Sequence, residues 1–191
     1  AHLPAGLLEN GPTVLDYGCG PGTASLAISA HSRNASLTLY DPQPEMRRVA
    51  GALLSTHKGA VQMVATPPQG TFDLVIAANV LNELSGDARA TLLASLQAYV
   101  SPGGTLLLLE PALLATTRAL MRDRDTLCTQ GFTPLFPCTH TLPCPMLAQT
   151  PHDWCHGTLR GDEPAVVRQL DALTGFNKDR VKYAAISAAR T

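Results

Sequence analysis

Short apolar runs alternate with amphipathic segments along the first 135 residues of the chain. The apolar runs have the length of strands, and Phe72–Ala78 is apolar nearly throughout, as expected of a central strand in a parallel sheet. Between the runs, apolar residues recur at helical spacing, as Met46, Val49 and Leu53 do. The pattern predicts strands over residues 13–16, 36–40, 60–64, 72–78, 105–109, 132–136 and 181–187. It predicts helices over residues 23–31, 44–56, 87–100, 112–130 and 164–173.

Strands that alternate with helices through short connections predict an α/β fold with a parallel sheet and helices on both faces. The alternation stops at residues 137–158, which are rich in proline and hold three cysteines, three histidines and the only tryptophan. We interpret this Cys/Pro-rich segment as an insertion before the last strand, within one domain that spans residues 1–191. The first strand follows Ala1 closely, so we expect a further N-terminal region to be missing from the sequence.

Composition narrows the class of protein without naming a function. The chain is 45% hydrophobic and 15% charged, which is typical of a globular domain, and its net charge of −1 does not indicate a strongly basic nucleic-acid binder. No apolar run approaches the roughly 18 residues that a membrane span needs, and no signal peptide is visible, so we expect no membrane association. Five cysteines in an α/β chain indicate a reducing compartment, either the bacterial cytoplasm or the mitochondrial matrix. We expect a monomer.

A glycine-rich loop, residues 16–22 with the sequence DYGCGPG, joins the first predicted strand to the first predicted helix. Glycines let a ligand approach the backbone closely, and loops at the carboxyl ends of parallel strands are where such sheets bind ligands. Asp41 ends the second strand, where an acid can accept hydrogen bonds from a ribose. Alone, the glycines could form a plain turn, and Asp41 could start a turn before Pro42. Their spacing together favours a ligand that contains a nucleoside.

Four segments resemble the motifs of class I S-adenosylmethionine-dependent methyltransferases: VLDYGCGPGT, LTLYDPQPEM, FDLVIAANVLNEL and SPGGTLLLLEP, within residues 13–111. The resemblance implies a Rossmann-like, seven-stranded methyltransferase sheet with S-adenosylmethionine as cofactor. It implies that Asp41 binds the ribose hydroxyls and that Asn79 lines the methyl-transfer side. It also implies that Gly18, Gly20 and Gly22 contact the amino-acid part of the cofactor. The remaining cofactor contacts that we predict are Asp16, Tyr17, Cys19, Pro42, Thr66 and Val80. Thr66 is included because the third strand lacks the acid that often holds the adenine.

The acceptor side has no decisive motif. No Asn-Pro-Pro-Tyr follows the fourth strand, which disfavours amino-group methylation of adenine or glutamine, and three lysines are too few for the Lys-Asp-Lys-Glu set of ribose methylation. Cys19 and Cys128 are not placed as nucleophiles. We therefore assign no catalytic residue, and we hold Asn79, Asn82 and Glu83 as candidates. Glu83 could be a general base or an acid at a helix start.

The insertion offers soft metal ligands. Cys138, Cys144 and Cys155 have the spacing C-x5-C-x10-C, with histidines interleaved, and thiolates in a reducing compartment bind zinc or an iron–sulfur cluster. The alternative is that the cysteines are buried as small hydrophobes. A five-residue strand separates Cys128 from Cys138, so we expect these two at opposite ends of the sheet. A histidine, His140, His152 or His156, is then the better fourth ligand, and we assign His156.

The segment PCTHTLPCPMLAQTPHDWCH, with GFNKDRVKYAAI downstream, resembles a methyltransferase-like family associated with the small ribosomal subunit, whose mitochondrial members act in ribosome assembly. This resemblance implies a four-cysteine iron–sulfur site with Cys138, Cys144 and Cys155 at three positions, and no cysteine follows Cys155 here. It implies the small ribosomal subunit or its RNA as partner.

Three functions remain open. The first is a methyltransferase that acts on ribosomal RNA of the small subunit, the second a ribosome assembly factor that transfers no methyl group, and the third a small-molecule methyltransferase with a structural metal loop. Lys178, Arg180 and Lys182 could face RNA phosphates or form a solvated strand entry.

Overall fold

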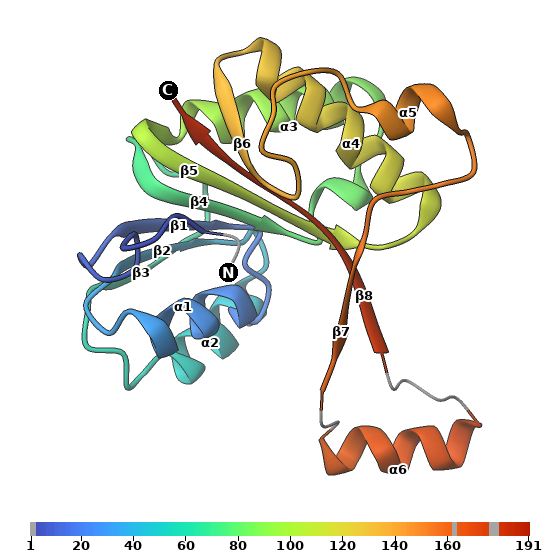
Figure 1. Cartoon of the computed structure of the whole chain (residues 1–191). Helices are drawn as coiled ribbons and strands as arrows, with labels where there is room; N and C mark the ends of the chain where they lie inside the picture. The colour runs from blue at the N-terminus through green and yellow to red at the C-terminus, as the bar shows by residue number, and fades with distance from the viewer. Residues whose placement is uncertain (1–2, 162–163, 176–179) are drawn as a thin grey trace.

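A mixed eight-stranded sheet with a helical layer on each face forms the body of the molecule (Figure 1). The computed structural model describes residues 3–161, 164–175 and 180–191. The strands are β1 Thr13–Tyr17, β2 Ser36–Tyr40, β3 Val61–Val64, β4 Phe72–Ala78, β5 Val100–Pro111, β6 Phe132–Phe136, β7 Gly157–Arg160 and β8 Arg180–Arg190. The helices are α1 Thr23–His31, α2 Pro44–Leu53, the short 3-10 helix η1 Leu81–Glu83, α3 Gly86–Ala98, α4 Leu114–Thr129, α5 Pro145–Gln149 and α6 Ala165–Thr174.

The strand order in the sheet is β3-β2-β1-β4-β5-β8-β6, with β7 paired to β8. Strands β1 to β5 are parallel, whereas β8 runs antiparallel to β5 and β6. The chain builds outward from β1 to β3 and then returns to the other side of β1 with β4, so the strand order switches between β1 and β4. Open α/β sheets bind ligands at the carboxyl ends of strands beside such a switch. The predicted Rossmann-like sheet is confirmed, and β7 is an additional strand.

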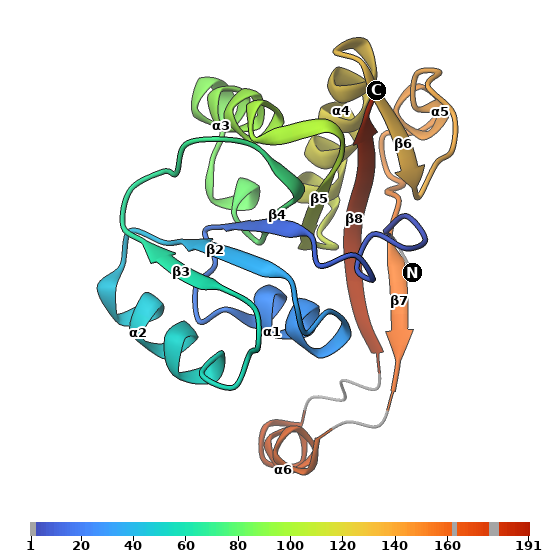
Figure 2. The same ribbon diagram turned by 90° about the vertical axis from the view of Figure 1, so that its left-hand side faces the viewer.

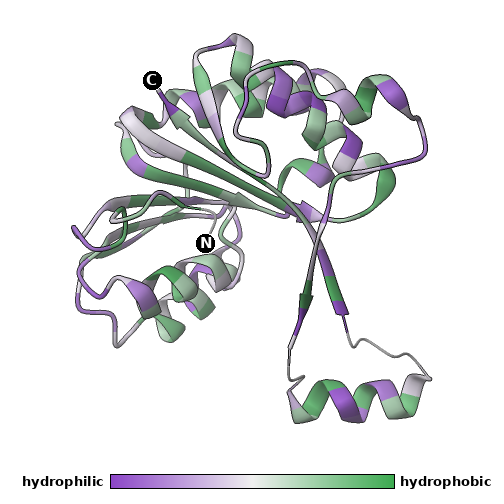
Figure 3. Cartoon of the chain, viewed as in Figure 1, coloured by the Kyte–Doolittle hydropathy of each residue, from purple (hydrophilic) through white to green (hydrophobic). Residues whose placement is uncertain are grey.

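Two hydrophobic cores lie on the two faces of the sheet, because successive strand residues point to opposite sides. In β1, Val14 and Leu15 are both fully buried, but Val14 packs with the α1 and α2 layer and Leu15 with the α3 and α4 layer. Figure 2 shows these layers on either side of the strands. Figure 3 shows that the central strands are predominantly hydrophobic, as strands covered on both faces should be.

Two elements differ from the sequence expectation. The fifth strand was expected over residues 105–109, but β5 already begins at Val100, which pairs with Phe72. The register then shifts between Phe72 and Leu74, and Gly103 adopts a φ of 76° there, so the irregularity is a bulge within one strand. The insertion at residues 137–158 is also less irregular than expected, since it contains α5 and the start of β7.

A two-stranded arm leaves the body at the right of Figure 1. It consists of β7, the first residues of β8, and α6 beyond their tips. No described residue of α6 is buried, and both views show α6 away from the sheet (Figures 1 and 2). In the part of the chain that the structure describes, no helix combines the length and apolar character needed to cross a bilayer.

Candidate functional site

A cavity of about 900 Å³ lies at the carboxyl ends of β1, β2 and β4, beside the switch in strand order. Its walls are the glycine-rich loop, the end of β2, the residues that follow β4 and one face of α3. Most of the residues predicted to bind the cofactor line it: Asp16, Tyr17, Gly18, Cys19, Gly20, Asp41, Pro42, Asn79 and Val80. Glu83 lines it as well, whereas Gly22, Thr66 and Asn82 do not.

The three loop glycines have different reasons for lacking a side chain. Gly18 has a φ of 70°, and a Cβ there would lie 2.7 Å from Cγ2 of Val80. A Cβ on Gly22, whose φ is 84°, would lie 2.9 Å from the Cβ of Ala50 in α2. Gly20 has a φ of 52° with nothing within 4 Å of its Cβ position. Gly20 therefore leaves room for a ligand, while Gly22 lets the loop pack closely on α2. The contact of Gly22 with the cofactor stays a prediction.

Asp16 ties the loop to α1. Its Oδ2 atom accepts hydrogen bonds from the backbone N–H of Ser25, at 3.1 Å, and from the Ser25 hydroxyl, at 2.7 Å. The carboxyl is only 2% exposed, and burial raises its pKa to about 6 despite the two hydrogen bonds. A cationic ligand in the cavity would favour the ionised form of this acid.

Asp41 joins the end of β2 to the loop. Its Oδ2 accepts from the N–H of Gly20 at 2.9 Å, and its Oδ1 accepts from the N–H of Gln43 at 2.9 Å. Each carboxylate oxygen has a second lone pair, so Asp41 can still accept hydrogen bonds from two ribose hydroxyls. The residues present thus fit the cofactor that the sequence motifs imply.

Cys19 and Tyr17 are poor reactive groups. Burial raises the pKa of the Cys19 thiol to about 12, so the thiol stays protonated at neutral pH, and its Sγ lies 3.4 Å from the carbonyl oxygen of Gly20. Tyr17 packs against Tyr40 with ring centroids 4.6 Å apart, and burial raises its pKa to about 12. These side chains shape the wall of the cavity rather than supply a base or a nucleophile.

The turn after β4 is held by an acid that the sequence analysis missed. Glu110, at the end of β5, is 1% exposed, and it accepts hydrogen bonds from the N–H groups of Leu81, at 2.9 Å, and Asn82, at 3.2 Å. The Asn82 amide nitrogen, in the orientation that satisfies its neighbours, lies 2.9 Å from Oε2 of Glu110. Asn82 therefore serves this turn and is not a candidate on the acceptor side. The only feature of the sequence that could have pointed to Glu110 was its position at the end of the apolar run of β5.

Two of the acceptor-side candidates remain. Asn79 adopts a φ of 58°, which asparagine tolerates better than most residues, and its N–H donates to the carbonyl oxygen of Leu109 at 2.8 Å. Asn79 and Glu83 are both exposed and both line the cavity. Behind them, Arg89 donates to the Leu81 carbonyl at 2.6 Å and forms a buried ion pair with Asp123. This pair fixes the turn from the side away from the cavity.

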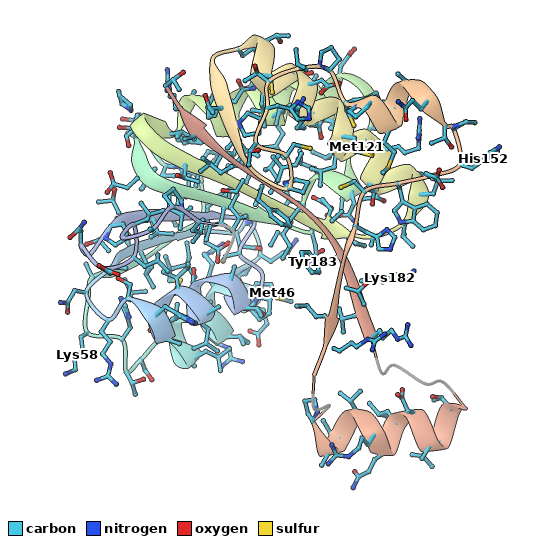
Figure 4. All side chains as sticks on the ribbon, in the orientation of Figure 1. Met46, Lys58, Met121, His152, Lys182 and Tyr183 are labelled. Carbon is cyan, nitrogen blue, oxygen red and sulfur yellow. The ribbon has the colours of Figure 1, made fainter. Side chains whose placement is uncertain are left out.

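Thr66 is not among the residues that line this cavity. It lies beyond β3 and lines a separate depression of about 420 Å³ with Thr38, Gln62 and Phe72. Its contact with the adenine stays a prediction. The starting turns of α2 instead supply Gln43 and Met46 to the cavity (Figure 4).

The insertion is organised by hydrogen bonds from α4. Arg118 donates to the carbonyl oxygens of Thr150, at 2.7 Å, and Asp153, at 2.9 Å. Arg124, nearly buried, donates to the carbonyl oxygen of Leu142 at 2.5 Å and to that of His140. A proline-rich loop that lacks regular structure thus obtains backbone partners without a metal. Figure 4 shows the insertion lying over Met121 of α4, with His152 at its outer bend.

The predicted metal ligands are not assembled as a set. Cys138, Cys144 and Cys155 line one apolar cavity of about 130 Å³ between α4, the insertion and β8. His156 instead stacks on Trp154, with ring centroids 5.4 Å apart. Among residues 3–161, 164–175 and 180–191, no three His, Cys, Asp or Glu side chains lie so that they could hold a metal ion. The predicted four-ligand set is therefore not seen among the described residues. The alternative of a buried small hydrophobe fits Cys144 alone, because Cys138 and Cys155 are only half-buried.

The placement of Cys128 was also wrong. Burial raises the pKa of its thiol, and Arg124, Asp125 and Cys138 lie close enough to influence that pKa. Cys128 and Cys138 are therefore neighbours, because the chain folds back onto α4 after β6. Asp125 fixes this return by accepting from the N–H of Cys144 at 3.1 Å.

Comparison with known proteins agrees with the site. The family described as methyltransferase domain matches residues 2–140. The chain is 32% identical over 114 residues to ribosomal RNA small subunit methyltransferase C of Salmonella choleraesuis, covering 56% of this chain and 33% of that protein. It is 32% identical over 105 residues to trans-aconitate 2-methyltransferase of Azoarcus, covering 54% of this chain and 41% of that protein. The chain thus spans between a third and two fifths of the length of these relatives.

Similar solved structures show the same fold over almost the whole chain. Magnesium protoporphyrin IX methyltransferase of Synechocystis, solved with bound S-adenosylmethionine, superposes with a TM-score of 0.57 at 15% identity and covers 97% of this chain and 74% of its own. The named relatives and this structure differ in the acceptors that their names give, so the likeness identifies the fold and not the substrate. The chain belongs to the methyltransferase domain family and has the fold of class I S-adenosylmethionine-dependent methyltransferases.

Proposed function

We propose that this chain transfers a methyl group from S-adenosylmethionine to a nucleobase of small-subunit ribosomal RNA. The observation that carries the proposal is the cavity beside the strand switch, which joins the glycine-rich loop, Asp41 and Asn79 in one wall. Its volume of about 900 Å³ is in the range that small-molecule sites occupy and leaves space for both a cofactor and an acceptor group.

In this account each part of the wall holds one part of the cofactor. The backbone of Gly18 and Gly20 contacts the amino-acid part, Asp41 accepts hydrogen bonds from the ribose hydroxyls, and Met46 covers the adenine. When bound, S-adenosylmethionine would supply the methyl group: an acceptor lone pair would bond to the methyl carbon as the carbon–sulfur bond breaks, and S-adenosylhomocysteine would leave. Asp16 stabilises the positive charge of the bound cofactor through its ionised form.

The charges of the residues that line the cavity favour a neutral acceptor group over an anionic one. Its ionisable acids are Asp16, Asp41 and Glu83, and no Lys, Arg or His occurs among its described lining residues. A small polycarboxylate, such as the substrate named for the Azoarcus relative, would bring several negative charges beside three acids. A nucleobase is neutral and can enter such a cavity after it leaves its stack, while its phosphates stay outside.

The residues on the acceptor side would act more by positioning the acceptor base than by acid–base chemistry. Asn79 can hydrogen-bond the edge of a base, and its strained backbone is fixed by the Leu109 carbonyl. Glu83 is exposed on the same wall and can take the proton that a methylated nitrogen must lose.

The test is incorporation of tritiated methyl groups from S-adenosylmethionine into purified small-subunit RNA. Methylated RNA is the expected product, and Asn79→Ala should lower the rate without abolishing cofactor binding. Cofactor binding by the wild-type protein with no transfer to the RNA would refute the proposal and favour the assembly-factor alternative. Equal transfer to trans-aconitate would refute the assignment of a neutral acceptor.

A further inference from the structure

The arm formed by β7, the start of β8 and α6 presents one basic face. In its ladder Arg160 lies directly opposite Arg180, and Thr158 lies opposite Lys182. Residues directly opposite each other in an antiparallel pair point to the same face, and so do residues two positions apart. Arg160, Arg180 and Lys182 therefore share one face of the ribbon, and all three are exposed.

The other face of the ribbon has a different character. Leu159 lies opposite Val181, and each is 60% exposed. Closer to the body, the Tyr183 ring lies over Gly157, where a Cβ would be 2.5 Å from Cζ of the ring. This cross-strand contact fixes the foot of the arm, which Figure 4 shows at Tyr183 and Lys182. The basic face is thus a property of a built element and not of a loose loop.

The described residues of this face of the ladder are Thr158, Arg160, Arg180 and Lys182. The face itself therefore presents three cations and a neutral side chain, and together the cations form a local positive patch. It indicates a polyanionic partner on this face.

The arm also starts at the edge of the sheet that holds the cofactor cavity. Tyr183 pairs with Pro111, the last residue of β5, and β5 is parallel to β1, β2 and β4. The first residues of β8 are therefore at the carboxyl ends of the parallel strands, where the cavity lies. No basic side chain occurs among the described residues that line the cavity, whereas three lie on the arm that starts at the same edge of the sheet.

We infer that the basic face of the arm, formed by Arg160, Arg180 and Lys182, binds the phosphate backbone of the RNA whose base enters the cavity. This separation suits an acceptor that is a neutral group carried on a polyanionic chain. The inference deepens the proposed function and rests on it only in that the bound RNA is taken as the acceptor.

The experiment measures binding of a fluorescein-labelled single-stranded RNA by fluorescence anisotropy at salt concentrations from about 50 to about 200 mM. The variant is Arg160→Gln with Lys182→Gln, and the matched control is Arg33→Gln with Lys58→Gln, which removes the same charge from exposed positions outside the arm (Lys58 in Figure 4). Each phosphate contact on single-stranded RNA contributes about 0.7 to the slope of log affinity against log salt. The arm variant should therefore lose about 1.4 from the slope and about 25-fold in affinity near 0.1 M salt.

The outcomes separate this inference from the proposed function. Binding is measured without cofactor, and S-adenosylmethionine binding by the arm variant, followed by calorimetry, should equal that of the wild type. Loss of methyl transfer with RNA binding intact would therefore count against the proposed function alone. The inference is overturned if the wild type does not bind the RNA, or if the arm variant and the control lose affinity equally. Displacement of the RNA by polyglutamate but not by polyphosphate would assign the face to an acidic protein and would also overturn it.

Discussion

Replacement of Asp16 by asparagine tests how the buried acid at the end of β1 works. Burial raises the pKa of Asp16 from 3.8 to about 6, which corresponds to about 3 kcal/mol at about 1.4 kcal/mol per pKa unit. The raised pKa means that folding favours the protonated acid. Its stabilising contribution is fully present below pH 3.8 and is lost as the pH rises through about 6. Asparagine keeps an oxygen that can accept from Ser25 but does not titrate.

The assay is urea unfolding of the wild type and Asp16→Asn at intervals between pH 4 and pH 7.5. Every other titrating group is common to both proteins, so the difference between their unfolding free energies isolates Asp16. We expect the variant to gain up to about 3 kcal/mol relative to the wild type between pH 4 and pH 7. Stability profiles that stay parallel over this range would refute the reasoning, since they would show that Asp16 has an ordinary pKa.

The same substitution tests the electrostatic role proposed for Asp16. A cationic cofactor favours the ionised acid, so wild-type affinity for S-adenosylmethionine should fall by up to tenfold per pH unit below about pH 6. Asp16→Asn should bind more weakly at pH 7.5 and show no such dependence. Calorimetry at each pH measures both, and identical pH dependence in the two proteins would show that the cofactor does not sense this acid.

Four further substitutions test separate parts of the structure. Gly22→Ala should lower the unfolding free energy by about 1–3 kcal/mol, because φ would be strained and the new Cβ would contact Ala50. Gly20→Ala should lower it by about 1 kcal/mol and mainly weaken cofactor binding. Urea unfolding and calorimetry distinguish the two patterns. Glu110→Ala leaves two N–H groups without their acceptor, so it should cost about 1–3 kcal/mol and slow methyl transfer, and a variant with wild-type turnover would disprove its positioning role. Arg124→Met should make the insertion more susceptible to cleavage by thermolysin, a protease that does not require arginine at its cleavage site. Unchanged cleavage would show that the hydrogen bonds from Arg124 to backbone carbonyls do not hold the insertion in place.

The glycine-rich loop and Asp41 could be predicted from the sequence because their chemistry is local. The loop connects a strand directly to a helix, and Asp41 follows a strand that pairs with β1, so spacing along the chain places both at one edge. The same logic gave the strands and helices of the body, since each has its own hydrophobic period. The close packing of Gly22 on Ala50 could not be predicted, because the two residues are distant in sequence.

The parts that could not be predicted depend on contacts between distant segments. Glu110 meets Leu81 across 29 positions of sequence, and Arg118 meets Asp153 across 35. The proximity of Cys128 to Cys138 required the return of the chain onto α4, which no period in the sequence reports. The position of Thr66 outside the cavity could not be predicted either, because β3 ends at Val64 and the course of the chain beyond it is not set by the strand pattern.

The most direct test of the central claim is calorimetric binding of S-adenosylmethionine to the wild type, to Asp41→Asn and to Glu9→Gln, an exposed acid outside the cavity. Asparagine preserves the shape of Asp41 but removes the negative charge that would strengthen its hydrogen bonds from the ribose hydroxyls. Loss of these charged hydrogen bonds should weaken binding by about 1.5–3 kcal/mol, which is about 10- to 150-fold, while Glu9→Gln binds as the wild type does. Wild-type protein that does not bind S-adenosylmethionine, or Asp41→Asn protein with unchanged affinity, would contradict the account.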